Sequence, residues 1–305
     1  VRGGGVWKSI DGGATWNLLT NTTGFWNVSK IVCDAAGNVY VGTNGNNQGL
    51  QRSTNGGTSW TNITPTNPGN SNSITDIKVS STGRLHVTMS GTNEAGSYFT
   101  DNPSTVTSAS WTAPITPIPN LNLNCEIAVA GNVLYALPEG ASAQTPQIYK
   151  STDGGFSWLP TPTSPPSTGT EPTINPGQGW YNLAIGIDPN NPDNCVAGGL
   201  NFYRTTDGGS TWTQITRWVG TVLNYVHADH HGVFWNGTQV LLSTDGGIFY
   251  SNNNGVSYSD RNVGIRTLQF YSCALHPTNN FYLGGTQDNG SHTVTATTGI
   301  GGSIE

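Results

Sequence analysis

The sequence predicts an all-β protein, a β-propeller of four-stranded antiparallel blades, and three observations support this prediction. Charged residues make up only 9% of the 305 residues, whereas glycine alone accounts for 41, as is typical of a turn-rich chain. A turn motif occurs five times, beginning at Ser9, Ser53, Ser151, Thr205 and Ser251, so its spacings are 44, 98, 54 and 46 residues. A period of about 40 to 55 residues corresponds to one four-stranded blade.

The motif combines a hydroxyl residue, an Asp or Asn two positions later, small residues, a second hydroxyl and an aromatic residue. An Asp or Asn side chain that accepts nearby backbone N–H groups, followed by glycines with positive φ, forms a tight hairpin turn. We call the five copies the box turns; they span residues 9–16, 53–60, 151–158, 205–212 and 251–258 and carry Asp11, Asn55, Asp153, Asp207 and Asn253. We predict a structural role for these five residues, because one such side chain per blade cannot converge on a substrate.

The repeat divides the chain into units. Five complete units are expected at about 25–66, 67–118, 119–165, 166–220 and 221–264, with partial units at 1–24 and 265–305. The double spacing contains a degraded copy at 99–102, which lacks the glycines. Either the first and last units join to close a six-bladed ring, or flanking sequence adds a seventh blade. We therefore expect one propeller domain that forms part of a longer protein.

Apolar and small residues alternate within each unit, as in half-buried antiparallel strands. In the second unit, strands are expected at 30–33, 39–43 and 50–53 and from Trp60 onward. The first unit would supply two strands, and the last unit two or three. Such a meander places the box turns on one face of the disc, here called the turn face. The opposite loop face carries the links between blades, and any binding pocket is expected there.

Composition also excludes some functions. The net charge is −6 and no basic cluster exists, so a nucleic-acid partner is not expected. No apolar run approaches the roughly 20 residues that span a bilayer. The four cysteines, Cys33, Cys125, Cys195 and Cys273, fall in different units. Strands of separate blades rarely bring Cα atoms within about 7 Å, so we expect four buried free thiols.

The densest polar cluster lies at 226–232 on the loop face and contains three histidines. On a strand, His227, Asp229 and His231 would point to one side and His230 to the other. Three interpretations stay open. The cluster is a hydrogen-bonded plug of the central channel, a ligand contact that includes His230, or a divalent metal site formed by His227, Asp229 and His231. The first two require no cofactor.

A second polar cluster, 285–290, follows a strand of the last unit and is expected on the same face. Its Gln287 and Asp288 could contact a ligand, although Asp-Asn-Gly also suits a tight turn. Asp229 and Asp288 are the candidate catalytic pair. Arg266 and Gln269 lie on the link between the two clusters, and Arg266 is a candidate ligand contact.

Aromatic residues also gather at loop-face positions. Trp26, Trp180 and Trp218 offer flat apolar surfaces of the kind on which sugar rings stack, although ordinary packing between blades explains them too. The isolated acids expected on this face are Glu94, Glu139 and Glu171.

The box turns resemble the Asp-box, or bacterial neuraminidase repeat (BNR repeat), of sialidases, sortilin-type receptors and xyloglucanase-like propellers. The clusters at 227–231 and 285–290 resemble a branch of large secreted bacterial propeller proteins related to xyloglucanase and sortilin propellers. The resemblance implies an extracellular or cell-surface location. It does not imply a sialidase, because Arg52 and Arg204 directly precede box turns and the Arg-Ile-Pro signature is absent.

Xyloglucanase-type hydrolases place two aspartates across a cleft between two propellers, and this chain supplies at most one propeller. We therefore expect a glycan- or protein-binding or scaffold module, as part of a larger surface assembly. The alternative is a glycoside hydrolase of the xyloglucanase-like type, so whether the chain is an enzyme stays open. A separation above about 12 Å between the carboxylates of Asp229 and Asp288 would exclude the hydrolase.

Overall fold

The computed structural model describes residues 4–44, 49–65, 73–91, 95–119, 121, 123–139, 147–165, 174, 177–219, 224–263, 269–275, 281–295 and 299–304. Within these residues the regular structure is β, apart from one 3-10 turn at Thr20–Thr22. No helix in the described part of the chain has the length and apolarity needed to cross a bilayer.

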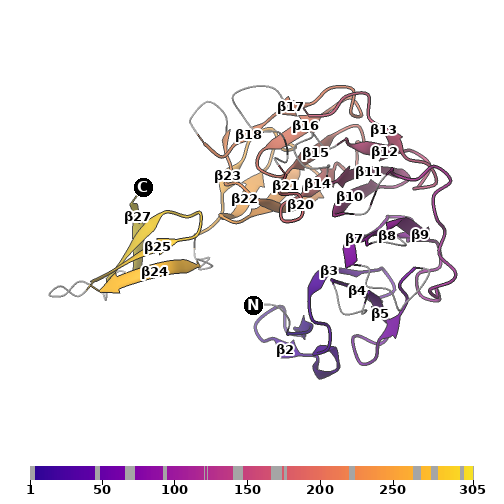
Figure 1. Cartoon of the computed structure of the whole chain (residues 1–305), viewed down its shortest axis with the longest axis horizontal. Helices are drawn as coiled ribbons and strands as arrows, with labels where there is room; N and C mark the ends of the chain where they lie inside the picture. The colour runs from indigo at the N-terminus through magenta and orange to yellow at the C-terminus, as the bar shows by residue number, and fades with distance from the viewer. Residues whose placement is uncertain are drawn as a thin grey trace.

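Antiparallel sheets follow one another along the chain, and each strand pairs with the next in sequence (Figure 1). This order confirms the predicted meander. The first two of the four-stranded sheets along the arc comprise β3 (Val28–Cys33), β4 (Val39–Thr43), β5 (Leu50–Ser53) and β6 (Thr61–Asn62), and then β10 (Cys125–Ala130), β11 (Val133–Pro138), β12 (Tyr149–Ser151) and β13 (Leu159–Pro160). The next comprises β14 (Ala184–Ile187), β15 (Cys195–Gly198), β16 (Phe202–Thr205) and β17 (Thr213–Gln214). It is followed by β20 (His230–Asn236), β21 (Gln239–Thr244), β22 (Gly247–Ser251) and β23 (Ser259–Asp260).

The remaining sheets are smaller or terminal. A three-stranded sheet comprises β7 (Ser73–Val79), β8 (Leu85–Ser90) and β9 (Gly96–Thr100), and β1 (Trp7–Lys8) pairs with β2 (Asn17–Leu18). A short parallel pair joins β18 (Thr216–Arg217) to β19 (Asn224–Tyr225). The last sheet comprises β24 (Phe270–Leu275), β25 (Phe281–Thr286), β26 (Ser291–Thr295) and β27 (Gly299–Ile304).

The core lies between neighbouring sheets. One buried cluster includes Tyr135, Leu137 and Ile185 and joins the β10–β13 sheet to the β14–β17 sheet. Equivalent clusters join β3–β6 to β7–β9 and β14–β17 to β20–β23. Burying each such side chain contributes about 1.5–3 kcal/mol. The arc of sheets is therefore held together mainly by apolar contact between sheet faces.

The box turns are held by their own side chains. In the third turn, Ser151 Oγ accepts the N–H of Gly155 at 2.9 Å, and Asp153 Oδ1 accepts the N–H of Ser157 at 2.9 Å. The other four turns have the same bonds at equivalent positions. Hydrogen bonds from Thr211 lower the pKa of Asp207 to about 2. The Asp and Asn side chains thus bind the turn backbone.

The chain ends differ from the expected arrangement. The last unit forms four strands rather than two or three, because β26 and β27 pair without a box turn. This sheet projects from the arc of sheets (Figure 1). Among the described residues, β1 pairs only with β2, so the terminal units do not share a blade here. The number of blades in a closed ring, six or seven, stays a prediction.

The cysteine prediction is half wrong. All four thiols are free, and Cys125 and Cys195 are buried, but Cys33 and Cys273 are exposed. Cys33 lies on the face of β3 opposite Lys30 and Val32, together with the exposed Ile31. Among the described residues, the sheet that precedes β3 consists of the two short strands β1 and β2, which leave this face of β3 exposed. Cys273 lies in the projecting sheet, where β24 is exposed from Tyr271 to Leu275.

Candidate functional site

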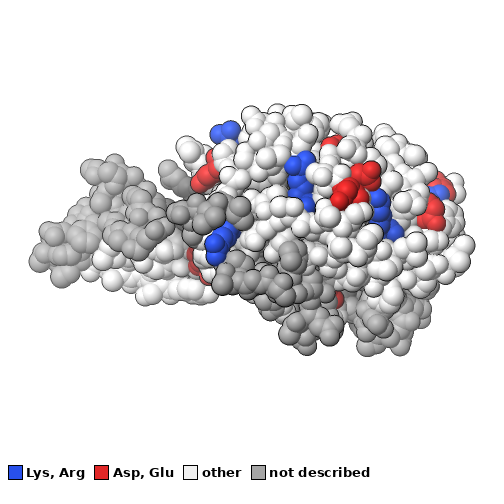
Figure 2. Space-filling view, turned by 90° about the horizontal axis from the view of Figure 1, so that it is seen from above, with Lys and Arg blue, Asp and Glu red and all other residues white. Residues whose placement is uncertain are grey.

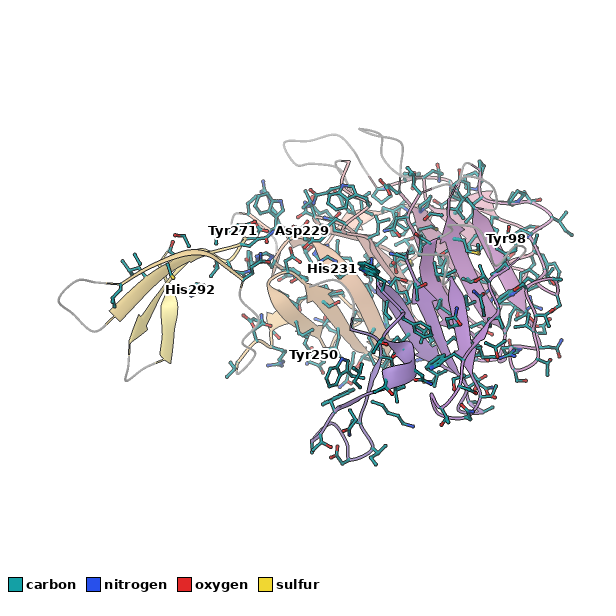
Figure 3. All side chains as sticks on the ribbon, turned by 60° about the horizontal axis from the view of Figure 1, so that its bottom comes forward. Tyr98, Asp229, His231, Tyr250, Tyr271 and His292 are labelled. Atoms are coloured by element: carbon teal, nitrogen blue, oxygen red, sulfur yellow. The ribbon has the colours of Figure 1, made fainter. Side chains whose placement is uncertain are left out.

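The polar cluster that precedes β20 is not an extended strand. Asp229 has φ +59° and β20 begins only at His230, where the pairing with β21 contains a bulge. The expected alternation of side chains from His227 to His231 is therefore wrong, since a left-handed residue changes the direction of the chain. Asp229 lies where the projecting C-terminal sheet meets the β20–β23 sheet (Figure 3).

Three carboxylates converge at this point. Oxygens of Asp229, Asp245 and Asp288 all lie within 4.8 Å of one another, and we call this group the carboxylate cluster. Asp245 begins the turn between β21 and β22, and Asp288 lies in the turn between β25 and β26. Both turns are connections on the loop face. The separation of Asp229 and Asp288 is thus far below the limit that would exclude a catalytic pair.

Neighbouring side chains orient the cluster. Gln178 Nε2 donates to Asp229 Oδ1 at 2.7 Å, and Asn182 donates to the same oxygen. Tyr181 donates its hydroxyl to Asp245 at 2.8 Å, and His231 Nε2 lies 2.7 Å from Asp245 Oδ1. Asp245 was not identified from the sequence, whereas Tyr181 belongs to the aromatic residues at 180–181 that were expected on the loop face. The available signal was that Asp245 opens a loop-face turn, like Asp288.

Backbone strain also concentrates here. Among the described residues, three non-glycine residues have positive φ, and two of them are Asp229 and Asp288. Such conformations cost about 1–3 kcal/mol each and are common at functional sites. The chain therefore maintains an unfavourable backbone conformation that brings two like charges close together.

The histidines have other partners than those expected. His227 Nε2 lies 2.6 Å from the carbonyl oxygen of Asp288, so it supports the backbone of that turn. His230 is fully buried, 4.0 Å from the ring of Phe202, and burial lowers its pKa to about 3. The His230 ring is therefore neutral and closed to a ligand. The side chains that lie close enough together to bind one cation are those of Asp229, Asp245 and Asp288, and not the predicted set of His227, Asp229 and His231.

Burial and the proximity of the three carboxylates raise the pKa of one of them. Burial, followed by the proximity of Asp245 and Asp288, raises the pKa of Asp229 against the opposing effect of Asn182. Carboxylate oxygens are the ligands that Ca²⁺ and Mg²⁺ prefer. A proton, a divalent cation or a cationic ligand group would each reduce the repulsion.

A cavity of about 460 Å³, which we call the central pocket, is lined by Tyr181 and His231, the two side chains that bind Asp245 of the cluster. Its volume falls in the range of small-molecule sites. It is lined by Ser29, Lys30, Asn44, Ser73, Thr75, Ser90, Leu123, Asn124, Glu126, Glu139, Trp180, Tyr181, Leu183 and His231. These residues lie at the loop-face ends of the inner strands and on the links between sheets, so pocket and cluster occupy the same face.

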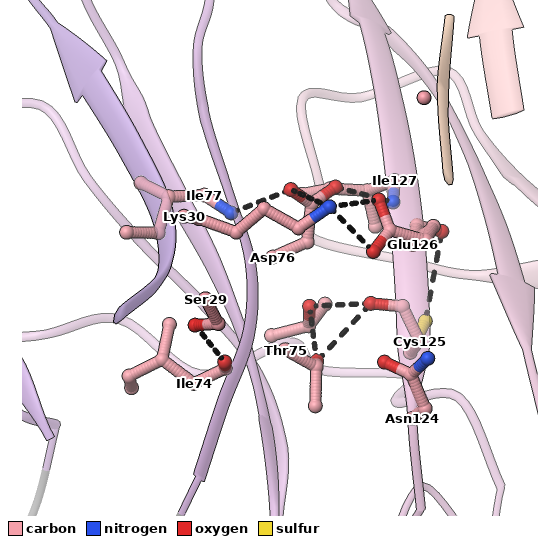
Figure 4. A network of polar contacts seen from close by, with 12 residues as sticks. Ser29, Lys30, Ile74, Thr75, Asp76, Ile77, Asn124, Cys125, Glu126 and Ile127 are labelled. Carbon is pink, nitrogen blue, oxygen red and sulfur yellow. Dashed lines mark hydrogen bonds and ion pairs between the residues drawn. The ribbon is translucent and has the colours of Figure 1, made fainter. Parts of the chain in front are cut away.

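Two of the lining residues, Lys30 and Glu126, belong to an ion network (Figure 4). Lys30 Nζ lies 2.7 Å from Glu126 and 3.8 Å from the buried Asp76, which also binds Lys78 at 2.6 Å. Burial alone would raise the pKa of Asp76, but the charges of Lys78 and Lys30 lower it. Burial and then the charge of Asp76 raise the pKa of Glu126 to about 8. The network joins β3, β7 and β10 at the centre of the molecule.

The remaining predicted residues lie outside these groups. Trp26 and Trp218 are 58% and 40% exposed, but neither lines the central pocket. Gln287 is partly buried and its N–H donates to Gln269 O at 2.9 Å. Of the isolated acids, Glu139 lines the pocket. Arg266, Glu94 and Glu171 lie outside the described residues.

Comparison with known proteins shows the class of fold but no family. No family model matches the chain. The curated xyloglucanase Xgh74A of Acetivibrio thermocellus is 27% identical over 251 residues, which cover 63% of this chain and 29% of that protein. The match thus spans less than a third of the length of this relative.

Solved structures give the fold. A Hadza microbial sialidase, Hz136, has a TM-score of 0.51 at 15% identity and covers 85% of this chain and 59% of its own. A GH74 enzyme of Niastella koreensis has a TM-score of 0.43 at 16% identity, with 98% and 66% covered. The sialidase is a β-propeller. At such identities the likeness to the sialidase supports the fold alone.

Proposed function

We propose that this chain is a glycan-binding module with Asp-box (BNR) repeats, part of a secreted or cell-surface bacterial protein, and that it binds sugars on its loop face. The observation that supports this most is the central pocket, about 460 Å³ in volume and lined by Trp180 and Tyr181 beside hydroxyl, amide and carboxyl groups. A sugar ring presents an apolar face that stacks on an aromatic ring, while its hydroxyls bond to polar groups around it. The match to a protein named xyloglucanase agrees with this proposal.

Charged residues make up only 9% of the chain, and on the side of the molecule seen in Figure 2 they are sparse and of both signs. Of the partners expected from the sequence, a glycan suits this pocket better than a protein does, because its described lining is mostly polar and recessed.

Replacement of Trp180 tests the proposal. Trp180 is 70% exposed at the pocket, so Trp180→Ala removes the stacking surface without opening the core. Aromatic contacts contribute about 0.5–1.5 kcal/mol beyond the buried area, and we expect affinity to fall by at least tenfold. The measurement is calorimetric titration with an oligosaccharide selected on a glycan array. Trp16→Ala, in a box turn, is the matched control and should bind normally. Equal binding by both variants would disprove a sugar site at Trp180.

A glycoside hydrolase is the second candidate, because Asp229 and Asp288 lie within the short separation that a nucleophile and an acid require. Asp229, whose pKa is raised, would be the acid and Asp288 the nucleophile. Reducing-sugar release from plant and microbial polysaccharides tests this activity, which Asp229→Asn and Asp288→Asn should both abolish. Binding without any release leaves the module non-catalytic.

A further inference from the structure

The central pocket contains an acidic group, Glu139, that no cation among the described residues neutralises. Glu126 and Glu139 both line it, and Lys30 is the one Lys or Arg among its described lining residues. The Lys30 ammonium is already bound to Glu126 and faces the buried Asp76. His231, the other basic side chain of the lining, is bound to Asp245.

Glu139 has no ion-pair partner among the described residues. It directly follows β11, where its N–H donates to Asn124 O at 2.7 Å and its Oε2 accepts the N–H of Asn124 at 3.3 Å. Burial raises the pKa of Glu139 against the effect of that hydrogen bond. A partly buried acid without a counter-charge favours a cation that enters from solvent.

The two aromatic side chains of the pocket lining, Trp180 and Tyr181, lie on a loop that Asn124 connects to Glu139. Asn124 Nδ2 donates to Gly179 O at 2.8 Å, and this bond attaches the end of β10 to the loop that carries Trp180 and Tyr181. The centroids of these two rings are 5.6 Å apart. Aromatic faces attract cations by about 0.5–2 kcal/mol. The carboxylate cluster adds three acids beyond Tyr181, so the local field favours a positive ligand group and repels a carboxylate.

We infer that the central pocket binds an amine-bearing sugar, with its ammonium paired to Glu139 and its ring against Trp180. This inference rests on the proposed function and specifies the class of glycan. A sugar fits better than the side chain of a peptide lysine because the pocket also carries Ser29, Ser73 and Ser90. Such hydroxyls bond to the hydroxyls of a sugar, whereas a lysine stem offers them no partner.

The test compares tetrasaccharides of which only one carries charged amino groups. We would titrate the whole chain with glucosamine tetramer, with its N-acetylated counterpart and with cellotetraose. We expect glucosamine tetramer to bind at least tenfold more tightly than the other two. In Glu139→Gln this preference should disappear, while the weaker binding of the uncharged tetramers remains. Asp193→Asn, which changes an exposed acid on the turn face that binds Lys150, is the control and should keep the preference.

The outcomes separate this inference from the proposed function. Equal binding of the three tetramers, or an unchanged preference in Glu139→Gln, would overturn the amine inference and leave glycan binding intact. No binding of any tetramer or array glycan would overturn both. Tighter binding of a lysine peptide than of glucosamine tetramer would refute a sugar as the ligand.

Discussion

At the residue scale, the charge of Glu126 on β10 depends on charged groups of two other strands, β3 and β7. Its pKa rises from an ordinary 4.5 to about 8 through burial and the charge of Asp76, with Lys30 opposing. The folded chain therefore binds a proton that the unfolded chain has released between these two pH values. The contribution of Glu126 to stability is present below pH 4.5 and is lost as pH rises toward 8.

Glu126→Gln removes this proton linkage. We expect the melting temperature of the wild type to fall between pH 5 and pH 8 and that of Glu126→Gln to fall less steeply. In terms of the free energy of unfolding, the slopes of the wild type and of Glu126→Gln against pH differ by at most about 1.4 kcal/mol per pH unit. Scanning fluorimetry at half-unit pH steps measures it, with Asp193→Asn as the control. Parallel curves for Glu126→Gln and the wild type would show that Glu126 does not titrate in this range.

The carboxylate cluster provides a second prediction at this scale. We propose that Asp229, Asp245 and Asp288 hold a divalent cation such as Ca²⁺. At 10 mM Ca²⁺ and a dissociation constant of about 1 mM, binding stabilises the fold by about 1.4 kcal/mol. Asp288→Asn should abolish this gain and, without cation, should match or exceed the stability of the wild type because repulsion falls. Melting curves with EDTA and with Ca²⁺ test both statements; a wild type that ignores Ca²⁺ would rule out the cation site.

At the scale of elements, a cation from one sheet reaches the box turn of the next. Lys8, Arg84 and Lys150 donate to the carbonyl oxygens of Gly56, Gly154 and Gly208, the first glycines of three turns. A Cβ on Gly154, whose φ is +76°, would lie 2.6 Å from Arg84 Nη1. The glycine therefore serves both the left-handed turn and the approach of the cation.

Arg84 makes the strongest of these contacts. It also forms a bidentate pair with Asp101, at 2.7 and 2.9 Å, and lies 4.5 Å from the centre of the Phe99 ring. Lysine cannot form this fork. We expect Arg84→Lys to cost about 1–2 kcal/mol and Lys8→Ala, which loses one exposed bond, less than about 1 kcal/mol. Chemical unfolding of both variants measures the difference, and equal losses would show that the fork adds nothing.

At the scale of the whole molecule, sheets inside the arc are covered on both faces, whereas β3–β6 and β20–β23, near its two ends, each have one face that is partly exposed. Phe234 on β20 is 63% exposed, and Ile31 on β3 is 48% exposed. Sheets of the interior bury such positions, as with Ile185 on β14. The projecting β24–β27 sheet leaves the face of β20–β23 uncovered (Figure 1).

Exposed apolar faces of this kind promote association. We expect Phe234→Ser to reduce self-association while changing stability by no more than about 0.5 kcal/mol. Ile185→Ser, at a comparable strand position inside the core, should cost more than about 2 kcal/mol. Light scattering during gel filtration, together with melting curves, distinguishes the two. A large loss of stability in Phe234→Ser would mean that this face is covered in solution.

The sequence by itself determined the box turns, the order of strands and the face on which the central pocket lies. These features depend on local bonds, such as those within residues 151–157, and on pairing between consecutive strands. Only the tertiary structure brought Asp245 to Tyr181, which is 64 residues away, and Glu126 to Lys30, which is 96 residues away. It also left Cys33 exposed. Contacts of this range depend on how the sheets stack, and no local pattern in the chain encodes that distance.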